Sequence, residues 1–203
     1  MLRSARLLAL LAVACLAAAC VAQRSFVDPG GPSLQAGDLV RPAQPLHLTV
    51  RATMLVDGLH EEDGDDLLRE RVERVLLASG VIEPVLEHAE GEIQVFLNDA
   101  GDRTASAAKG FGTGLSFGAA GSSIEDNYEM TVTITQAGRT FRSAGLRQVI
   151  HTLLGQAPAP PGAEMLETSA AVERVIRQLL LEALVQFQRS KRPGATGSTA
   201  PHA

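Results

Sequence analysis

A strict alternation of side chains in residues 128–135 is the strongest constraint on the fold. Apolar side chains occupy every even position of this segment, and Glu or Thr occupies every odd position. A period of two places the two classes on opposite faces of a β-strand, so one face is buried and the other meets water. Residues 136–138 (Gln-Ala-Gly) end the strand, and residues 139–144 return beside it, which predicts a hairpin.

Two shorter segments show the same alternation, namely residues 46–51 and residues 93–97. Both are predicted to be strands with one buried face. Residues 146–154 are ambiguous, because their apolar spacing suits a helix while their β-branched side chains favour a strand. We favour a strand that continues from the hairpin.

Two segments carry apolar residues at helical spacing. The first covers residues 68–79, follows an acidic turn and stops at Gly80. The second covers residues 171–189 and ends before Pro193. Two apolar stripes and a half-buried sheet cover one another when the helices lie together, so we predict an α+β fold: an antiparallel or mixed four-stranded sheet with two helices on one face. The stripe of the second helix consists of Val172, Ile176, Leu179, Ala183 and Phe187.

The composition excludes several classes of protein. The 203 residues carry a formal net charge of −5, which lacks the basic field that nucleic-acid binding needs. Both cysteines lie within the first 20 residues, so the rest of the chain has no disulfide framework. No Gly-x-Gly-x-x-Gly pattern supports dinucleotide binding, and we predict no cofactor.

The N-terminus has the layout of a secretory signal peptide, which we assign to residues 1–19. Arg3 and Arg6 precede a charge-free apolar run over residues 7–19. A membrane-spanning helix needs roughly 20 residues, so this run is too short to span and is typical of a signal.

Residues 16–20 (Leu-Ala-Ala-Ala-Cys) resemble the lipobox of bacterial lipoproteins, although Leu16 stands one position further from the Cys than is usual. The resemblance implies cleavage before Cys20 and lipid attachment to it. Cys15 offers a weaker match, and residues 17–19 also fit an ordinary secretory signal. A cysteine kept at the cleavage point and nowhere later favours lipidation. Val21 in place of Asp implies, by the same resemblance, the outer membrane.

The mature chain divides into three parts. Residues 20–45 hold the lipidated Cys and a Pro- and Gly-rich flexible tether, residues 46–190 form one domain, and residues 191–203 are a disordered tail. Lipobox, tether and α+β layout together resemble small proteobacterial envelope lipoproteins, including the lipopolysaccharide-assembly lipoprotein of the outer membrane. The resemblance transfers no functional residue except Cys20.

One short motif in the sequence is typical of a catalytic site. Residues 114–118 (Gly-Leu-Ser-Phe-Gly) match the nucleophile elbow of hydrolases, and Asp126 and His151 follow in a suitable order. The elbow requires a helix after the serine, whereas residues 119–123 (Ala-Ala-Gly-Ser-Ser) do not begin one. A serine hydrolase using Ser116 therefore stays an alternative, and we predict no enzyme.

The acidic stretch over residues 57–66 supplies carboxylates, the hard oxygen ligands that calcium prefers. Calcium-loop spacing would put a ligand at position 59, which is Leu59, so a solvated loop leading into a helix is the preferred interpretation. The histidines are scattered without zinc-ligand spacing, and we predict no metal site. They are His47, His60, His88 and His151 among the central residues.

A long segment between two predicted strands is unusually apolar. Residues 110–124 contain no charge, and Phe111, Leu115 and Phe117 share one parity opposite a row of Gly and Ser. As a strand this segment would present an apolar face to a partner protein or to the membrane. A glycine zipper and packing onto the domain's own core are the alternatives. The predicted function is a non-enzymatic, periplasm-facing lipoprotein of the outer membrane, an accessory or binding module in envelope assembly or transport with an envelope protein partner.

Overall fold

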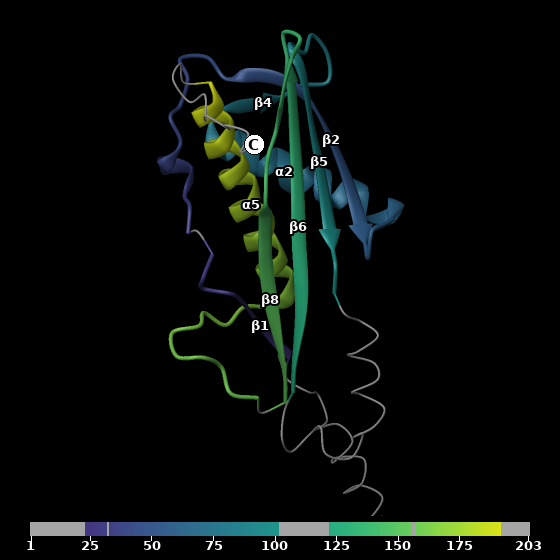
Figure 1. Cartoon of the computed structure of the whole chain (residues 1–203), viewed down its shortest axis with the longest axis vertical. Helices are drawn as coiled ribbons and strands as arrows, with labels where there is room; N and C mark the ends of the chain where they lie inside the picture. Colours follow the sequence, from purple (N-terminus) through teal and green to yellow (C-terminus); the bar gives the residue numbers. More distant parts are fainter. Residues whose placement is uncertain (1–22, 32, 102–121, 156, 192–203) are drawn as a thin grey trace, which may run out of the picture.

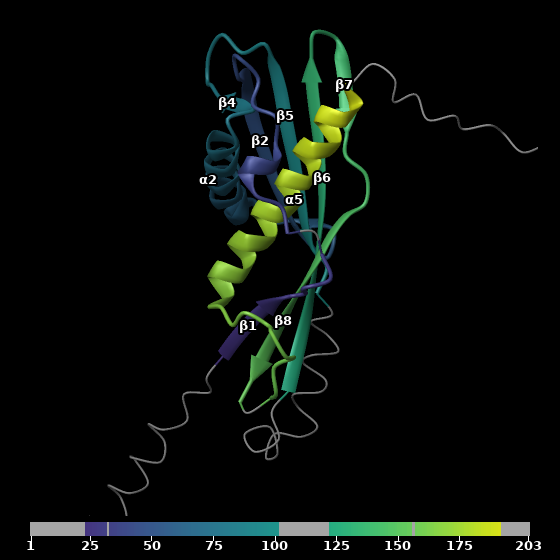
Figure 2. The same cartoon turned by 90° about the vertical axis from the view of Figure 1, so that its left-hand side faces the viewer.

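Two helices cover one face of a mixed β-sheet in the computed structural model, which describes residues 23–31, 33–101, 122–155 and 157–191. Figures 1 and 2 show both helices on the same side of the sheet, so the expected α+β architecture is confirmed. The helical elements are a short 3-10 turn η1 (Ala36–Asp38), α2 (Glu62–Ser79) and α5 (Thr168–Ser190). The strands are β1 (Gln23–Val27), β2 (Leu46–Val56), β3 (Leu59–His60), β4 (Ile82–Pro84), β5 (Gly91–Asp99), β6 (Ser122–Gln136), β7 (Arg139–Arg142) and β8 (Leu146–Leu154).

The strands follow the order β1-β8-β6-β5-β2-β3, with β4 also paired to β2 and β7 also paired to β6. Strands β4 and β5 run parallel to β2, and the other pairs are antiparallel. Parallel neighbours need a crossover connection, and α2 supplies it between β2 and β5. The later part of the chain is built from antiparallel neighbours and ends in α5.

The expected number of four strands is wrong, because the sheet has eight. Strands β3 and β4 contain two and three residues, too few to leave a period in the sequence. Residues 139–154 form two strands, because the chain breaks at Ser143, whose N–H donates to the carbonyl oxygen of Val132 at 2.8 Å. The hairpin and the strand interpretation of residues 146–154 are both confirmed.

The sheet also begins earlier than the sequence predicts, since β1 lies within the range assigned to the tether. It pairs antiparallel with β8, where Phe26 faces His151 and is only 4% exposed. The hydroxyl of the buried Ser25 lies 3.0 Å from the hydroxyls of Thr152 and Thr168. These contacts join β1 to β8 and to the first turn of α5, so the domain starts at β1.

The core lies between the sheet and the helices. The even positions of β6 that are apolar in sequence are all buried there, as the alternation predicts. Helix α2 packs on β2 and β4, helix α5 packs on β8 and β1, and the two helices touch each other. Gly80 ends α2 in a left-handed conformation with φ of 67°. The opposite face of the sheet carries mostly polar side chains on β5 and β6, together with Phe96, which is 39% exposed, and the register of the β1–β8 pair places the buried Phe26 and Leu153 on this face too.

Candidate ligand-binding groove

A segment without strands connects β1 to β2 and lies along the outside of the helices. We call its described residues, 28–31 and 33–40, the strap. Gln178 of α5 holds it by two hydrogen bonds to one residue: Leu34 N–H donates to Oε1 at 2.8 Å, and Nε2 donates to the Leu34 carbonyl oxygen at 3.0 Å. Gln188 binds Val40 in the same manner, at 3.1 and 2.7 Å. The strap is therefore fixed to α5 at two points.

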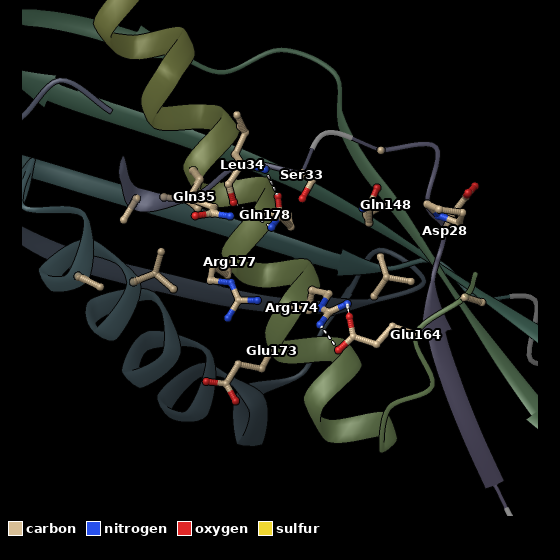
Figure 3. Close-up of a pocket in the computed structure, with 18 of the residues that line it drawn as sticks. Asp28, Ser33, Leu34, Gln35, Gln148, Glu164, Glu173, Arg174, Arg177 and Gln178 are labelled. Atoms are coloured by element: carbon tan, nitrogen blue, oxygen red, sulfur yellow. Dashed lines mark hydrogen bonds and ion pairs between the residues drawn. The ribbon is translucent and has the colours of Figure 1, made fainter. Parts of the chain in front are cut away.

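A cavity of about 730 Å³, which we call the groove, lies between the strap, α2, α5 and residues 162–164. Figure 3 shows side chains from the strap and both long helices around it. Its floor is apolar: Leu181 is 2% exposed, and Val75 and Leu34 pack against the core. Its polar lining residues include Asp28, Arg74, Gln148, Glu164, Glu173, Arg174, Arg177 and Gln178.

Two of the three arginines in the groove are paired with carboxylates. Arg174 donates two hydrogen bonds of 2.9 Å to Glu164, which hold the pKa of that carboxyl below its ordinary value and raise the pKa of the guanidinium. Arg74 donates 2.8 Å hydrogen bonds to Glu70 on its own helix and to Glu173 on α5. These pairs link the two helices and the 162–164 turn across the mouth of the groove.

The third arginine, Arg177, is exposed and makes no hydrogen bond or ion pair with any residue in the described ranges. It lies one helical turn from Arg174, and Figure 3 shows both guanidinium groups on the groove side of α5. Its positive charge also lowers the pKa of Glu164, although less than Arg174 does. All its guanidinium donors are therefore available to a ligand.

The second unpaired polar group in the groove is the amide of Gln148 on β8. Gln148 is 7% exposed and lies at a buried position of the strand, facing the helices. Over the part of the chain that the structure describes, no hydrogen bond reaches its amide, although the strap passes so closely that a Cβ at Gly31 would collide with Oε1. Neither amide atom is fully buried without a partner, and Gln148 lines the groove, so the amide opens into the groove. There it can hydrogen-bond to water or to a ligand.

The third carboxylate of the groove, besides Glu164 and Glu173, belongs to Asp28 and is engaged within the strap. Oδ1 of Asp28 accepts a hydrogen bond of 2.9 Å from Gly30 N–H within the strap. The groove thus combines an apolar floor with the unpaired guanidinium of Arg177 and the unpaired amide of Gln148. Such a set of groups can bind an amphiphilic molecule with a polar, anionic end.

Several residues singled out in the sequence lie outside the described ranges. They are the lipidation residue Cys20, the elbow serine Ser116 and the apolar residues Phe111, Leu115 and Phe117.

Both proposed partners of the elbow serine are described, and the structure does not bring them together. Asp126 pairs with Ile150 on β8, whereas His151 pairs with Glu125 on β6. Successive residues of a strand face opposite sides of the sheet, so Asp126 and His151 lie on opposite faces. Nδ1 of His151 lies 3.5 Å from Glu125, and its ring stacks on Phe26 with 4.8 Å between the ring centroids.

The acidic stretch leads into α2, as expected, and Asp65 has a structural role there. Its Oδ1 accepts a 2.7 Å hydrogen bond from Met54 N–H, and its Oδ2 lies 2.8 Å from Nε2 of His60. Burial raises the pKa of Asp65, but the bonds from Met54 and His60 outweigh it, so the pKa falls below its ordinary value. Within the described ranges, no group of three or more His, Cys, Asp or Glu side chains is arranged to hold a metal ion.

The groove has no counterpart among the sites predicted from the sequence. Arg174 and Arg177 belong to the polar side of an amphipathic helix, where charge is ordinary. The sequence does indicate that Gln148 is unusual. It lies between Leu146 and Ile150 on the buried face of the strand, where apolar side chains are expected. A polar residue at such a position has to find a partner or face a cavity.

The chain matches no family model and no curated protein. None of the described helices is both long and apolar enough to cross a membrane.

Proposed function

We propose that this chain is a non-enzymatic, lipid-anchored envelope protein that acts as a binding module, with the groove as its ligand site. The observation that carries the proposal is the pair of unsatisfied polar groups, Gln148 and Arg177, beside an apolar floor. The lipobox resemblance at residues 16–20 supplies the anchor. The setting is an accessory role in outer-membrane assembly or transport, as in the small envelope lipoproteins whose layout the chain resembles.

The distance between the anchor residue and the sheet supports a site close to the membrane. Strand β1 begins at Gln23, three residues after Cys20. An extended chain spans at most about 3.3–3.6 Å per residue, so lipid on Cys20 would hold the start of β1 within roughly 10 Å of the anchor. Acyl chains on a single cysteine give stable attachment when more than one is present. Val21 favours the outer membrane, with the domain on the periplasmic side.

The test of the anchor uses the two cysteines as a matched pair. In cells grown with labelled palmitate, the wild-type chain and Cys15→Ser should take up label, and Cys20→Ser should take up none. Density-gradient separation should place the labelled chain with the outer membrane. A wild-type chain without label would refute the anchor, and label retained in Cys20→Ser would refute its position.

A second surface is proposed at Phe111, Leu115 and Phe117, for contact with an envelope protein partner. In the register of the sheet, Leu154 pairs with Gln23 on one side and with Ser122 on the other. The chain that follows Cys20 and the apolar segment that precedes Ser122 therefore join the sheet at the same end. A partner held near the anchor would meet this end first.

The partner surface is tested by replacing both phenylalanines, Phe111 and Phe117, with serine. The double variant should lose its crosslinks to envelope proteins in cells and keep its melting temperature. A collapsed melting temperature with unchanged crosslinks would mean that these side chains belong to the core.

A further inference from the structure

We infer that the groove binds an acyl lipid with a phosphate headgroup, with the phosphate on Arg177 and a neighbouring headgroup hydroxyl on Gln148. The inference rests on the proposed function, because it names the ligand class of the same groove. Four features of the described residues support it: volume, free charge, free amide and position along the chain.

The size of the groove suits a small amphiphile. Its volume of about 730 Å³ lies within the range of roughly 300–1,000 Å³ that is common for small-molecule sites. Leu181, Val75 and Leu34 form an apolar floor on which an acyl chain would bury its methylene groups.

The free charge in the groove selects an anion. Arg74 and Arg174 already have carboxylate partners, whereas Arg177 has none among the described residues. A guanidinium presents a rigid fork of donors that matches phosphate oxygens two at a time. Arg174 lies one turn away, so a phosphate on Arg177 would also meet the edge of the Arg174–Glu164 pair.

The free amide adds a requirement that a bare acyl chain does not meet. An amide side chain both donates and accepts, and so does a hydroxyl group, so a hydroxyl beside the phosphate would satisfy Gln148 in both directions. This pairing explains why a polar residue is kept at a buried strand position whose neighbours along that face, Leu146 and Ile150, are apolar.

The position of the groove gives it access to membrane lipids. Val27 lines the groove and lies seven residues after Cys20. At about 3.3–3.6 Å per residue, this part of the groove lies no further than roughly 25 Å of chain from the anchor. A lipid that leaves the membrane beside the anchor would therefore have only a short distance to travel to the groove.

The test uses a chain of residues 20–203 with the substitution Cys20→Ser. This chain contains every described element and carries no lipid of its own, and calorimetry measures how tightly it binds a lipid probe. The probe is lysophosphatidylglycerol below its micelle-forming concentration. We expect saturable binding to one site. Arg177→Gln should weaken it by about tenfold or more, which is about 1.4 kcal/mol. Arg189→Gln is the matched control, because Arg189 is also exposed on α5 but lies outside the groove.

Gln148→Met separates a binding role from a structural one. The amide makes no hydrogen bond within the described part of the fold, so its removal should leave the melting temperature unchanged or raise it, while binding of the probe becomes weaker. A lowered melting temperature with unchanged binding would assign Gln148 to the fold and overturn its role in the groove.

Two further probes identify the parts of the ligand that matter. Lysophosphatidylcholine, whose choline headgroup adds a positive charge and lacks the two headgroup hydroxyls of the first probe, should bind more weakly, and glycerol 3-phosphate without an acyl chain should bind least. Equal binding of glycerol 3-phosphate would make the groove a phosphate site and overturn the lipid assignment. No binding of any probe, or equal loss in Arg177→Gln and Arg189→Gln, would overturn the inference. The palmitate experiment is independent of these results, so a failed ligand and a failed anchor are distinguished.

Discussion

Replacing Phe26 with alanine tests whether the domain begins at β1. Phe26 is 4% exposed and stacks on His151 across the β1–β8 pair. Truncating a buried Phe to Ala costs about 3–5 kcal/mol, because apolar contact is lost and a cavity remains. For a domain of 150–250 residues each kcal/mol lowers the melting temperature by about 2–4 °C, so we expect a drop of about 6–20 °C.

The assay is urea unfolding followed by far-ultraviolet circular dichroism, with thermal melts in parallel. The control is Val40→Ala, a change in the same predicted tether at a side chain that is 60% exposed. An exposed substitution of this kind stays within about 0.5 kcal/mol of the wild type. The same urea midpoint for Phe26→Ala and Val40→Ala would contradict this reasoning. It would mean that β1 adds no stability and that residues 20–45 are a tether.

Three further predictions concern helix α5, the Asp65–His60 pair and strand β5. Leu179→Ala should lower the free energy of unfolding by about 2–5 kcal/mol, because Leu179 is 2% exposed. Glu182→Ala on the same helix should change it little, and equal effects would mean that the apolar stripe of α5 is misplaced. The hydrogen bond with Asp65 raises the pKa of His60 above 6.5, so an NMR titration should give a value above 6.5 that falls towards it in Asp65→Asn. Because this pKa is raised on folding, the pair stabilises the fold below pH 6.5, and the contribution is lost as the pH rises through the folded-state pKa. Gly91→Ala should lower the melting temperature, because its methyl group would collide with a backbone carbonyl oxygen of β6; an unchanged melting temperature would contradict this β5–β6 register.

The elements with a continuous buried face could be predicted from the sequence. Burial on one side leaves a period of two in residues 128–135 and a helical period in residues 68–79 and 171–189, and the structure confirms a strand and two helices there. The residues at which these elements begin and end are not fixed by the period. Strand β6 begins at Ser122, because its first part pairs with β8 beyond the end of β5.

Strand β1 could not be predicted, because nothing local requires it. It has five residues and is followed at once by the Pro- and Gly-rich strap. Its stability comes from β8, and the hydroxyls of Ser25 and Thr152 that meet across the pair are 127 residues apart in sequence. A strand fixed only by such distant contacts leaves no period of its own.

The groove could not be predicted either, since its lining comes from five separate parts of the chain. Arg177 is an ordinary surface residue in sequence and becomes a candidate binding group only when Arg74 and Arg174 are seen to have their own carboxylates. Gln148 is the exception. Once residues 146–154 are taken as a strand, its parity already predicts a polar side chain on the buried face.

The most direct test of a lipid-binding groove is photo-crosslinking in living cells. A photoreactive phenylalanine analogue replaces Ala78, an exposed residue of α2 that lines the groove, and in a second strain it replaces Phe96 on the open face of the sheet. After irradiation, mass spectrometry of the purified chain should find a phospholipid-sized adduct at position 78 and none at position 96. No lipid adduct at position 78, or equal lipid adducts at both positions, would contradict the account.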